Sequence, residues 1–317
     1  SACTRKIIPC KYIHGPTLDL LNLRDEVTQH LTNVGWARYA SINLPAFTEL
    51  TWEFYATFEF NIPDEFSVTT PGVVRFRLMG REFNQSITEF NLALGFIDIP
   101  YSQSEEYMHS VCEYSEPFFS HYLDYWSDLS VDRQVYDPSQ SKASYLKSAA
   151  YRYLHRFMAY SFSGRKDSSG TLTKPEFFFV WCMVTRTRVN LGSWFALHLR
   201  TVLSKKNKPL ILGSFITQLA VNLGVLDLNN HNLHRACTME PLDLVCLEKM
   251  GLVRQVNGAF QFAPPGPISV PPKRSASKST APEAGGPSTD TPGPSSSAPP
   301  PSSSVDSQLA ALRFQMQ

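Results

Sequence analysis

The sequence is poor in cysteine and in long hydrophobic runs. Its six cysteines are scattered over 317 residues without the dense spacing of a small disulfide-rich secreted domain, so we expect reduced thiols and an intracellular protein, nuclear or cytoplasmic. The N-terminal residues lack the order of basic, apolar and small residues that marks a signal peptide. The longest apolar stretches, Phe177–Val184 and Leu210–Val225, are too short or too interrupted to cross a bilayer of ~30 Å. We therefore expect no membrane partner.

The motifs of common catalytic sites are also missing. The chain has no GxxxxGKS/T phosphate loop, no GxGxxG turn and no HExxH helix, which leaves nucleotide hydrolysis and zinc proteolysis without a sequence basis. No nucleophile, base and orienting partner form a recognisable set. We therefore predict that the protein is not an enzyme, and that it uses no cofactor and no small-molecule substrate.

Two acidic motifs resemble catalytic ones only superficially. Residues 167–170 read Asp-Ser-Ser-Gly. This stretch differs from the Asp-Ser/Thr-Gly motif of an aspartic protease by an extra serine, and the stretch lies between helical segments rather than at a strand turn. The series Asp124, Asp128 and Asp132 has i,i+4 spacing and could supply part of the metal cluster of a transposase-type nuclease. A solvated helix face explains the series more simply, so a nuclease is the least favoured hypothesis.

The best metal-binding candidate is the group His231, His234, Cys237 and Cys246. Its spacing, H-x2-H-x2-C-x8-C, differs from the C-x2-C-x4-H-x4-C of a zinc knuckle. Four such ligands could satisfy tetrahedral zinc, but the last gap crosses Pro241 and an apparent helix start. We therefore predict no metal site and interpret the four as ordinary loop and core residues.

Hydrophobic residues make up 43% of the chain and aromatic residues 12%, which is enough for a sizeable core. The tail is the exception, because residues 264–317 hold 12 of the 23 prolines, 12 serines and a single aromatic residue, Phe314. Such a composition buries too little apolar surface to offset the entropy of ordering, so we predict a disordered Pro/Ser-rich linker over 264–304. Residues 305–317 read as the start of a truncated helix that could serve self-association.

The net charge of +1 hides two opposite halves. Residues 1–142 carry 10 Lys and Arg against 19 Asp and Glu, a balance of −9, whereas residues 143–263 carry 15 against 6, a balance of +9. This division can steer the acidic half of one copy toward the basic half of another, or present the basic half to nucleic acid. Cancellation within one molecule remains the alternative.

The apolar periodicity predicts a mainly α (α+β) domain over 17–263, with an acidic half 17–142 and a basic half 143–263 after an N-terminal segment 1–16. Capping boxes at Ser86/Glu89 and Thr173/Glu176 mark two helix starts. Alternation over 58–78 and the Asn257-Gly258 turn predict one or two small β-hairpins. The other expected helices are 18–34 before Gly35, one from Pro45 to Phe58, 145–161, 191–203, 210–222 and 241–250.

Seven stretches carry a family resemblance in their order and spacing: 52–56, 74–78, 89–95, 154–160, 164–170, 174–183 and 188–192. They resemble the protein of the first open reading frame of Athila-type plant retrotransposons, also described as a plant transposon protein domain. The resemblance covers about Arg24 to Phe262 and rests on apolar and glycine positions that carry no reaction. It implies an element-encoded, gag-like role. From the charge division we expect, in addition, that the protein assembles with itself into an oligomer.

The basic half also predicts contact with RNA or DNA. The segment from Lys147 to Lys208 contains twelve Lys and Arg residues and only two acidic residues, Asp167 and Glu176. Aromatic residues such as Tyr151 and Tyr153 lie between the basic ones. The alternative is that these arginines cover buried aromatic rings and that the tyrosines are core. The candidate nucleic-acid-binding residues are Arg152, Arg156, Arg165, Lys166, Arg186, Arg188, Arg200, Lys205, Lys206 and Lys208.

The favoured interpretation is therefore a non-catalytic, gag-like protein that acts by self-assembly and nucleic-acid binding. Two alternatives stay open. A DNA-binding module could be built from the C-terminal helix and hairpin, whose order is that of a winged helix. A host protein with a domain derived from the element would have the same chemistry.

Overall fold

The computed structural model describes residues 5–61, 72–110, 120–132, 134–165, 170–205 and 208–268. Thirteen α-helices and four small sheets lie in these residues, which confirms the mainly α (α+β) class. The part of the expected linker beyond Ile268, and the expected helix 305–317, lie outside the described residues.

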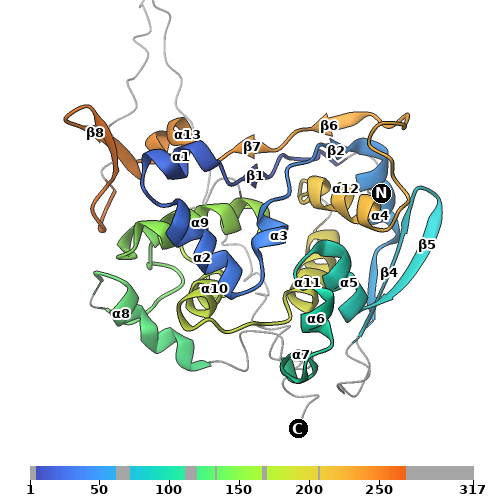
Figure 1. The fold of residues 1–317 in the computed structure, drawn as a ribbon, viewed down its shortest axis with the longest axis horizontal. Helices are drawn as coiled ribbons and strands as arrows, with labels where there is room; N and C mark the ends of the chain where they lie inside the picture. Colours follow the sequence, from blue (N-terminus) through green and yellow to red (C-terminus); the bar gives the residue numbers. More distant parts are fainter. Residues whose placement is uncertain are drawn as a thin grey trace, which may run out of the picture. The chain divides into compact units, whose positions relative to one another are not determined.

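Two almost completely buried helices form the centre of one group of helices (Figure 1). They are α9 (Ala149–Ser161) and α10 (Lys174–Thr185). The predicted capping box begins α10, because the Thr173 hydroxyl and the Glu176 carboxylate each satisfy a backbone N–H at the helix start. The continuous apolar run that follows is buried on every side, as its composition predicts.

A second group of helices packs around α11 (Leu191–Ser204). Tyr39 joins the two groups, because its ring stacks on Phe215 with 4.3 Å between centroids and its hydroxyl donates to the Ser161 carbonyl at 3.0 Å. The other helices of this group, each predicted at least in part, are α4 (Thr48–Thr57), α5 (Ile87–Leu94) and α12 (Gly213–Asn222).

Four very short strands tie the N-terminal residues to the C-terminal part of the unit, and they run along the upper edge in Figure 1. They form a parallel pair, β1 (Lys11–Tyr12) with β7 (Glu240–Pro241), and an antiparallel pair, β2 (Ala46–Phe47) with β6 (Arg235–Cys237). Strands of two or three residues show no alternation, and their partners lie about 200 residues away along the chain, so the sequence did not predict them.

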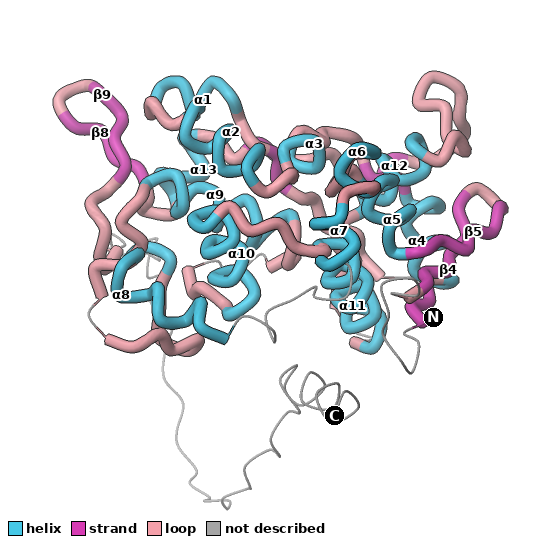
Figure 2. The backbone as a smooth tube through the Cα atoms, turned by 60° about the horizontal axis from the view of Figure 1, so that its bottom comes forward, coloured by secondary structure: helices cyan, strands magenta, loops and turns pink. Residues whose placement is uncertain are grey.

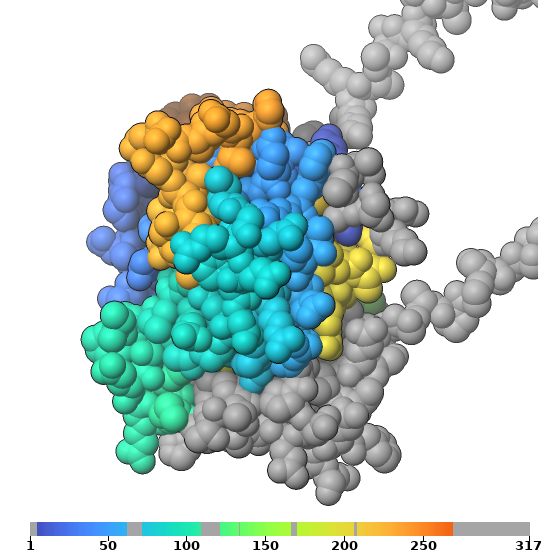
Figure 3. All heavy atoms as spheres, turned by 90° about the vertical axis from the view of Figure 1, so that its right-hand side faces the viewer, coloured from blue at the N-terminus to red at the C-terminus, as the bar shows by residue number. Residues whose placement is uncertain are grey.

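The ribbon expected over 58–78 is a three-stranded antiparallel sheet. The predicted alternation holds along the middle strand, where Val74 and Phe76 are buried and Arg75 and Arg77 are exposed. The third strand was missed because its polar sequence, Arg-Glu-Phe-Asn-Gln-Ser, gives little strand signal. The strands are β3 (Glu59–Asn61), β4 (Val73–Leu78) and β5 (Arg81–Ser86), and Figure 3 looks onto the face that they form beside α4.

The C-terminal helix and hairpin agree with the sequence. Asn257 and Gly258 have φ values of 50° and 82°, as a two-residue hairpin turn requires. The elements are α13 (Leu244–Lys249), β8 (Val253–Val256) and β9 (Ala259–Phe262). In Figure 2 this hairpin and the β4–β5 hairpin lie at opposite ends, with the helices between them.

The shorter helices differ from the expected boundaries. The helix expected over 18–34 is interrupted at Asn22, whose φ is 53°, although Gly35 ends it in the left-handed conformation as predicted. The helix expected from Pro45 begins at Thr48, because residues 46–47 pair with β6. The remaining helices are α1 (Gly15–Leu20), α2 (Arg24–Asn33), α3 (Ala37–Ala40), α6 (Ile99–Ser102), α7 (Glu105–Ser110), α8 (Trp126–Leu129) and the 3-10 helices η3 (Ser120–Tyr125) and η4 (Ala143–Tyr145).

Candidate nucleic-acid interface

Two of the ten candidate residues, both on α9, are buried. Arg152 donates to the Ala263 carbonyl at 2.5 Å, and its guanidinium lies 5.1 Å from the centroid of the Phe262 ring. Arg156 is 3% exposed, and burial lowers its pKa to about 10. Arg152 therefore helps to hold the C-terminal hairpin on α9, and Arg156 is buried in the core. For these two residues, the alternative interpretation of the basic segment, in which arginines cover the protein's own apolar surface, describes the geometry.

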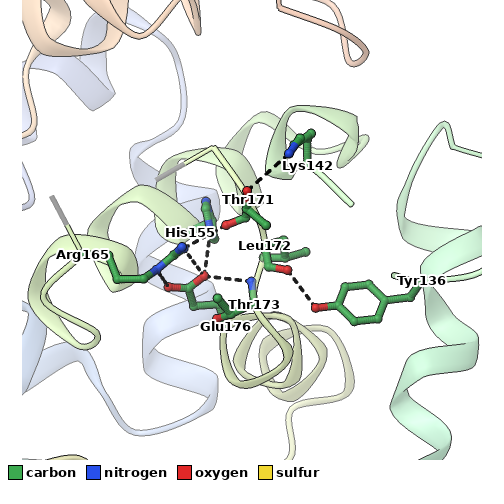
Figure 4. A network of polar contacts seen from close by, with 8 residues as sticks. All are labelled: Tyr136, Lys142, His155, Arg165, Thr171, Leu172, Thr173 and Glu176. Carbon is green, nitrogen blue, oxygen red and sulfur yellow. Dashed lines mark hydrogen bonds and ion pairs between the residues drawn. The ribbon is translucent and has the colours of Figure 1, made fainter. Parts of the chain in front are cut away.

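Arg165, a third candidate, belongs to a buried polar cluster around Glu176 (Figure 4). Its Nε lies 2.9 Å from Glu176 Oε1 and its Nη2 lies 2.5 Å from Oε2. His155 Nε2 lies 3.1 Å from the same Oε2, and the Thr173 backbone N–H donates to it at 3.1 Å. One carboxylate therefore joins α9, the start of α10 and the loop between them.

The electrostatics of this cluster favour a charged carboxylate. Burial alone would raise the pKa of Glu176, but the hydrogen bond from His155 and the nearby positive charge of Arg165 outweigh it and lower the pKa to about 2. Burial lowers the pKa of His155, and Glu176 offsets only part of that change. Both side chains are 0% exposed, so the cluster can hold the core together but offers substrate no access.

A second buried polar cluster joins α5 to the start of α11. Asn91, which is 0% exposed, donates to the Asn190 Oδ1 at 2.7 Å and to the Tyr107 hydroxyl at 3.3 Å. Its own Oδ1 accepts from the Gly192 N–H at 2.8 Å. A Cβ at Gly192 would lie only 2.5 Å from that oxygen, so this contact requires glycine. The cluster brings together two stretches that lie far apart in the sequence, Glu-Phe-Asn at 89–91 and Asn-Leu-Gly at 190–192.

Two of the exposed candidates, Lys205 and Lys208, lie where the N-terminal segment crosses the end of α11. Arg5 donates from Nε to the Lys208 carbonyl at 2.6 Å and from Nη2 to the Val202 carbonyl at 3.1 Å. The Leu210 N–H donates to the Lys6 carbonyl at 2.8 Å. We call Arg5, Lys6, Lys205 and Lys208 the α11-end patch. Figure 3 shows N-terminal residues in dark blue beside residues near 200 in yellow.

Arg5 and Lys6 were not predicted as part of the site. Sequence reasoning grouped cations by their position along the chain, and about 200 residues separate this pair from Lys205. The only local signal is that two consecutive basic residues precede an apolar pair, Ile7-Ile8, which is too common to be diagnostic. The pairing of Ile7 with Leu210 brings the two segments together.

The remaining candidates lie elsewhere. Arg186 is exposed and Arg188 is half-buried in the loop between α10 and α11, at the opposite end of α11 from the patch. Arg200 is exposed on α11 between the two groups. Lys166 and Lys206 lie outside the described residues. The candidates therefore do not form one surface, because α11, with 14 residues, separates two groups by about 21 Å.

The aromatic residues of the segment are mainly structural. Tyr153 is fully buried, accepts from the His14 N–H and donates to the Leu242 carbonyl at 3.0 Å. Tyr151 is half-buried and packs against His30, with ring centroids 4.6 Å apart. Tyr153 is therefore not available to stack on bases, and Tyr151 already contacts another ring.

The four zinc-ligand candidates each have a different place or contact in the fold. His234 bonds to the Glu49 carboxylate through Nδ1 at 2.5 Å, His231 packs on the Phe47 ring, and Cys237 lies in β6. Cys246 lies on α13, where its N–H donates to Asp243. Among the residues that the structure describes, no three His, Cys, Asp or Glu side chains are grouped as a metal ion would need.

The acidic series and the winged-helix order can also be placed. Asp124 lies in η3, Asp128 in α8 and Asp132 beyond it, so the three do not share one helix face. Residues 166–169, which include most of the protease-like stretch, lie outside the described residues. Between α12 and α13, the segment 223–243 pairs with β1 and β2, so these two helices are not joined by the short turn of a helix-turn-helix unit.

The fold and its polar clusters define a mainly helical α+β protein whose motif residues hold its own core together. No helix in the described part of the chain is long and apolar enough to cross a membrane. The model of the ATHILA ORF-1 family matches residues 4–186, more than half of the chain, so the protein belongs to this family of plant retrotransposon proteins. No curated protein and no solved structure matches it.

Proposed function

We propose that this retrotransposon-derived protein binds nucleic acid through the α11-end patch and assembles with copies of itself, without catalysing a reaction. The observation that carries the proposal is the gathering of four cations from two distant segments. Lys6, Lys205 and Lys208 are exposed, and none of the four pairs with a carboxylate among the described residues. Such a group attracts phosphate, because each neutralised phosphate releases counterions.

The geometry of Arg5 supports a rigid patch. Its two bonds to the carbonyls of Val202 and Lys208 fix the N-terminal segment against the end of α11, and they satisfy backbone acceptors at a helix C-terminus. Cations held by a fixed backbone lose less conformational entropy on binding than cations on a free tail. The patch is therefore a better phosphate site than the same charges on an unstructured segment.

The proposal that the protein is not catalytic rests on the structural role of the polar residues in the two buried clusters. His155 and Glu176 bond to each other inside the core, and Asn91 and Asn190 do the same in the second cluster. A general base must reach the proton that it removes, and none of these four side chains is more than 1% exposed. Their place in the stretches that carry the family resemblance is explained by folding.

Binding to labelled single-stranded RNA across a salt series tests the patch. The variant Lys6→Gln/Lys205→Gln/Lys208→Gln removes three charges, and we expect the slope of log K against log salt to become shallower by about 2, at about 0.7 per lost contact. The matched control is Arg235→Gln/Lys249→Gln/Arg254→Gln, which removes three exposed charges of the same half elsewhere. Equal losses in both variants, or no salt-dependent binding by the wild type, would remove the patch as the site.

A second observation favours assembly. Among the ion pairs between described residues, none joins an Asp or Glu of 17–142 to a Lys or Arg of 143–263. Direct pairing of these charges between described residues therefore does not cancel the opposite balances of the two halves, and the two signs can attract each other between copies. We expect the weight-average mass in sedimentation equilibrium to rise with concentration at low salt and to fall when salt is added. A constant mass would contradict assembly.

A further inference from the structure

Three arginines lie on segments near the start of α11, the end opposite the α11-end patch. Arg38 lies on α3, and Arg186 and Arg188 lie in the loop between α10 and α11. The guanidinium carbon of Arg188 is 4.2 Å from the centroid of the Tyr101 ring and 3.7 Å from the position that a Cβ at Gly35 would occupy. We call Arg38, Arg186 and Arg188 the arginine corner.

Two glycines make room for this corner. Gly35 and Gly95 both have a left-handed φ, 79° and 76°, and each ends a helix. The side-chain stem of Arg38 would be 3.1 Å from a Cβ at Gly95, while the Phe96 carbonyl is 3.5 Å from the Cβ position of Gly35. The α2–α3 turn and the end of α5 therefore touch, and Arg38 and Arg188 flank their contact.

No acceptor in the described part of the protein engages these guanidinium groups. Arg38, Arg186 and Arg188 form no side-chain hydrogen bond and no ion pair with any described residue, although a guanidinium carries five N–H donors. Arg188 is nevertheless half-buried and oriented by its stacking on Tyr101. A guanidinium that is oriented by a ring and has no acceptor among the described residues is suited to an anion supplied from outside.

Two carboxylates on neighbouring elements have other partners. Glu26 on α2 accepts from the Ser148 hydroxyl at 2.8 Å and lies 3.7 Å from His30 Nε2. Asp98 accepts from the Tyr101 N–H at 2.8 Å as the N-cap of α6. Burial lowers the pKa of His30, and the charge of Arg186 contributes to that change, which places the Arg186 charge within reach of α2.

The backbone of Arg186 gives an independent reason to look for a ligand. Arg186 ends α10 with φ 60° and ψ 26°, the left-handed conformation that glycine adopts more readily than any side-chain-bearing residue. Its exposed side chain forms no hydrogen bond and no ion pair with a described residue. A non-glycine residue in this conformation is often retained for function.

From these observations we infer that the arginine corner is a second contact for nucleic acid and that it selects single strands. This inference rests on the proposed function and names its substrate class. A guanidinium oriented on an aromatic ring, as in Arg188, can stack on and hydrogen-bond to unpaired bases, whereas the stacking faces of bases in a duplex are covered by the neighbouring base pairs. The two basic groups lie about 21 Å apart along α11. A flexible single strand can bend to reach both, but a duplex is stiff over that length.

Fluorescence anisotropy with the full chain at one fixed salt concentration tests this inference. The probes are a single-stranded RNA, a single-stranded DNA of the same sequence and the corresponding DNA duplex. We expect Arg186→Gly and Arg188→Gln each to weaken binding of one or both single strands about tenfold, and binding of the duplex less than twofold. Weaker binding of both the single-stranded RNA and the single-stranded DNA identifies contacts to base and phosphate. Weaker binding of the RNA alone identifies a contact to the 2′-hydroxyl. Either result supports the arginine corner as a binding site.

The matched control is Arg254→Gln, which removes an exposed, unpaired charge from β8. We expect it to change no affinity by more than twofold. If the single strands bind both corner variants as well as they bind the wild type while the α11-end patch variant loses them, the inference is wrong and the proposed function stands. Equal losses for single strands and duplex also overturn single-strand selection. If the wild type binds none of the probes, the proposed function itself fails.

Discussion

The buried and the exposed cations of the basic half differ in what they contact. Arg152 and Arg165 bond to carbonyl or carboxylate groups of the protein, and Arg165 shares Glu176 with a fully buried histidine. Arg186 and Lys208 use no side-chain donor on a described protein acceptor. The balance of +9 therefore overstates the charge offered to a partner, because part of it is committed to the core. Removing a cation that bonds within the core should destabilise the protein, and removing an exposed one should mainly affect binding.

The largest effect should come from Glu176→Gln. This change leaves Arg165 and the buried side of the cluster without their countercharge, and we expect a loss of about 3 kcal/mol in the free energy of unfolding, measured with urea. The matched control is Glu89→Gln in the other capping box, which is exposed and should lose less than about 1 kcal/mol. Similar small losses in both variants would show that the Glu176 cluster is not a support of the core.

Acid should weaken the buried cluster in two stages. The pKa of His155 is lowered from 6.5 by burial, so below pH 6.5 the unfolded chain binds a proton that the folded chain does not, and stability falls. The pKa of Glu176 is lowered from 4.5 to about 2, so its contribution is complete above 4.5 and is lost as pH falls through that interval. Each group adds a slope of at most about 1.4 kcal/mol per pH unit.

Urea unfolding at a series of pH values from 7 to 3 measures both stages, in steps of about half a pH unit that resolve such slopes. Glu176→Gln should lose the lower stage, because its side chain does not titrate. His198 should add to the upper stage, since burial lowers its pKa to about 4. A stability that stays constant between neutral pH and the acid limit would contradict the assignment of these histidines as buried and neutral.

An added methyl group at Gly192, in the second buried cluster, should destabilise the protein more than the same group at an exposed glycine. In Gly192→Ala the new Cβ would meet Asn91 Oδ1 at 2.5 Å, and Asn91 cannot move away without breaking its bond to Asn190. We expect a loss of about 2 kcal/mol in thermal or urea unfolding. Gly170→Ala is the control, because nothing lies within 4 Å of its Cβ position, and its effect should stay within about 0.5 kcal/mol. Equal effects would mean that the contact at Gly192 relaxes freely.

The sequence predicted what local chemistry decides. Both capping boxes, the Asn257-Gly258 turn and the buried run of α10 follow from residues within a few positions of one another. It could not predict that Asn91 meets Gly192, or that Arg5 meets Lys208, because no local pattern encodes contacts between residues about 100 or 200 positions apart. The site was therefore predicted in part: its charges were identified, but not which of them the core uses.

The smallest effect should also have the opposite sign. Arg186→Gly places glycine in a left-handed conformation that suits it, and removes an exposed side chain that forms no hydrogen bond or ion pair with a described residue, so we expect a gain of about 0.5 kcal/mol in the free energy of unfolding. Arg200→Gly is the matched control, since it removes the same side chain from the right-handed helix α11 and should lose about 1 kcal/mol. If Arg186→Gly loses as much as Arg200→Gly, the arginine supports the fold. A gain in stability together with weaker single-strand binding would separate the exposed cations from the buried ones, because the same substitution would then improve folding and impair binding.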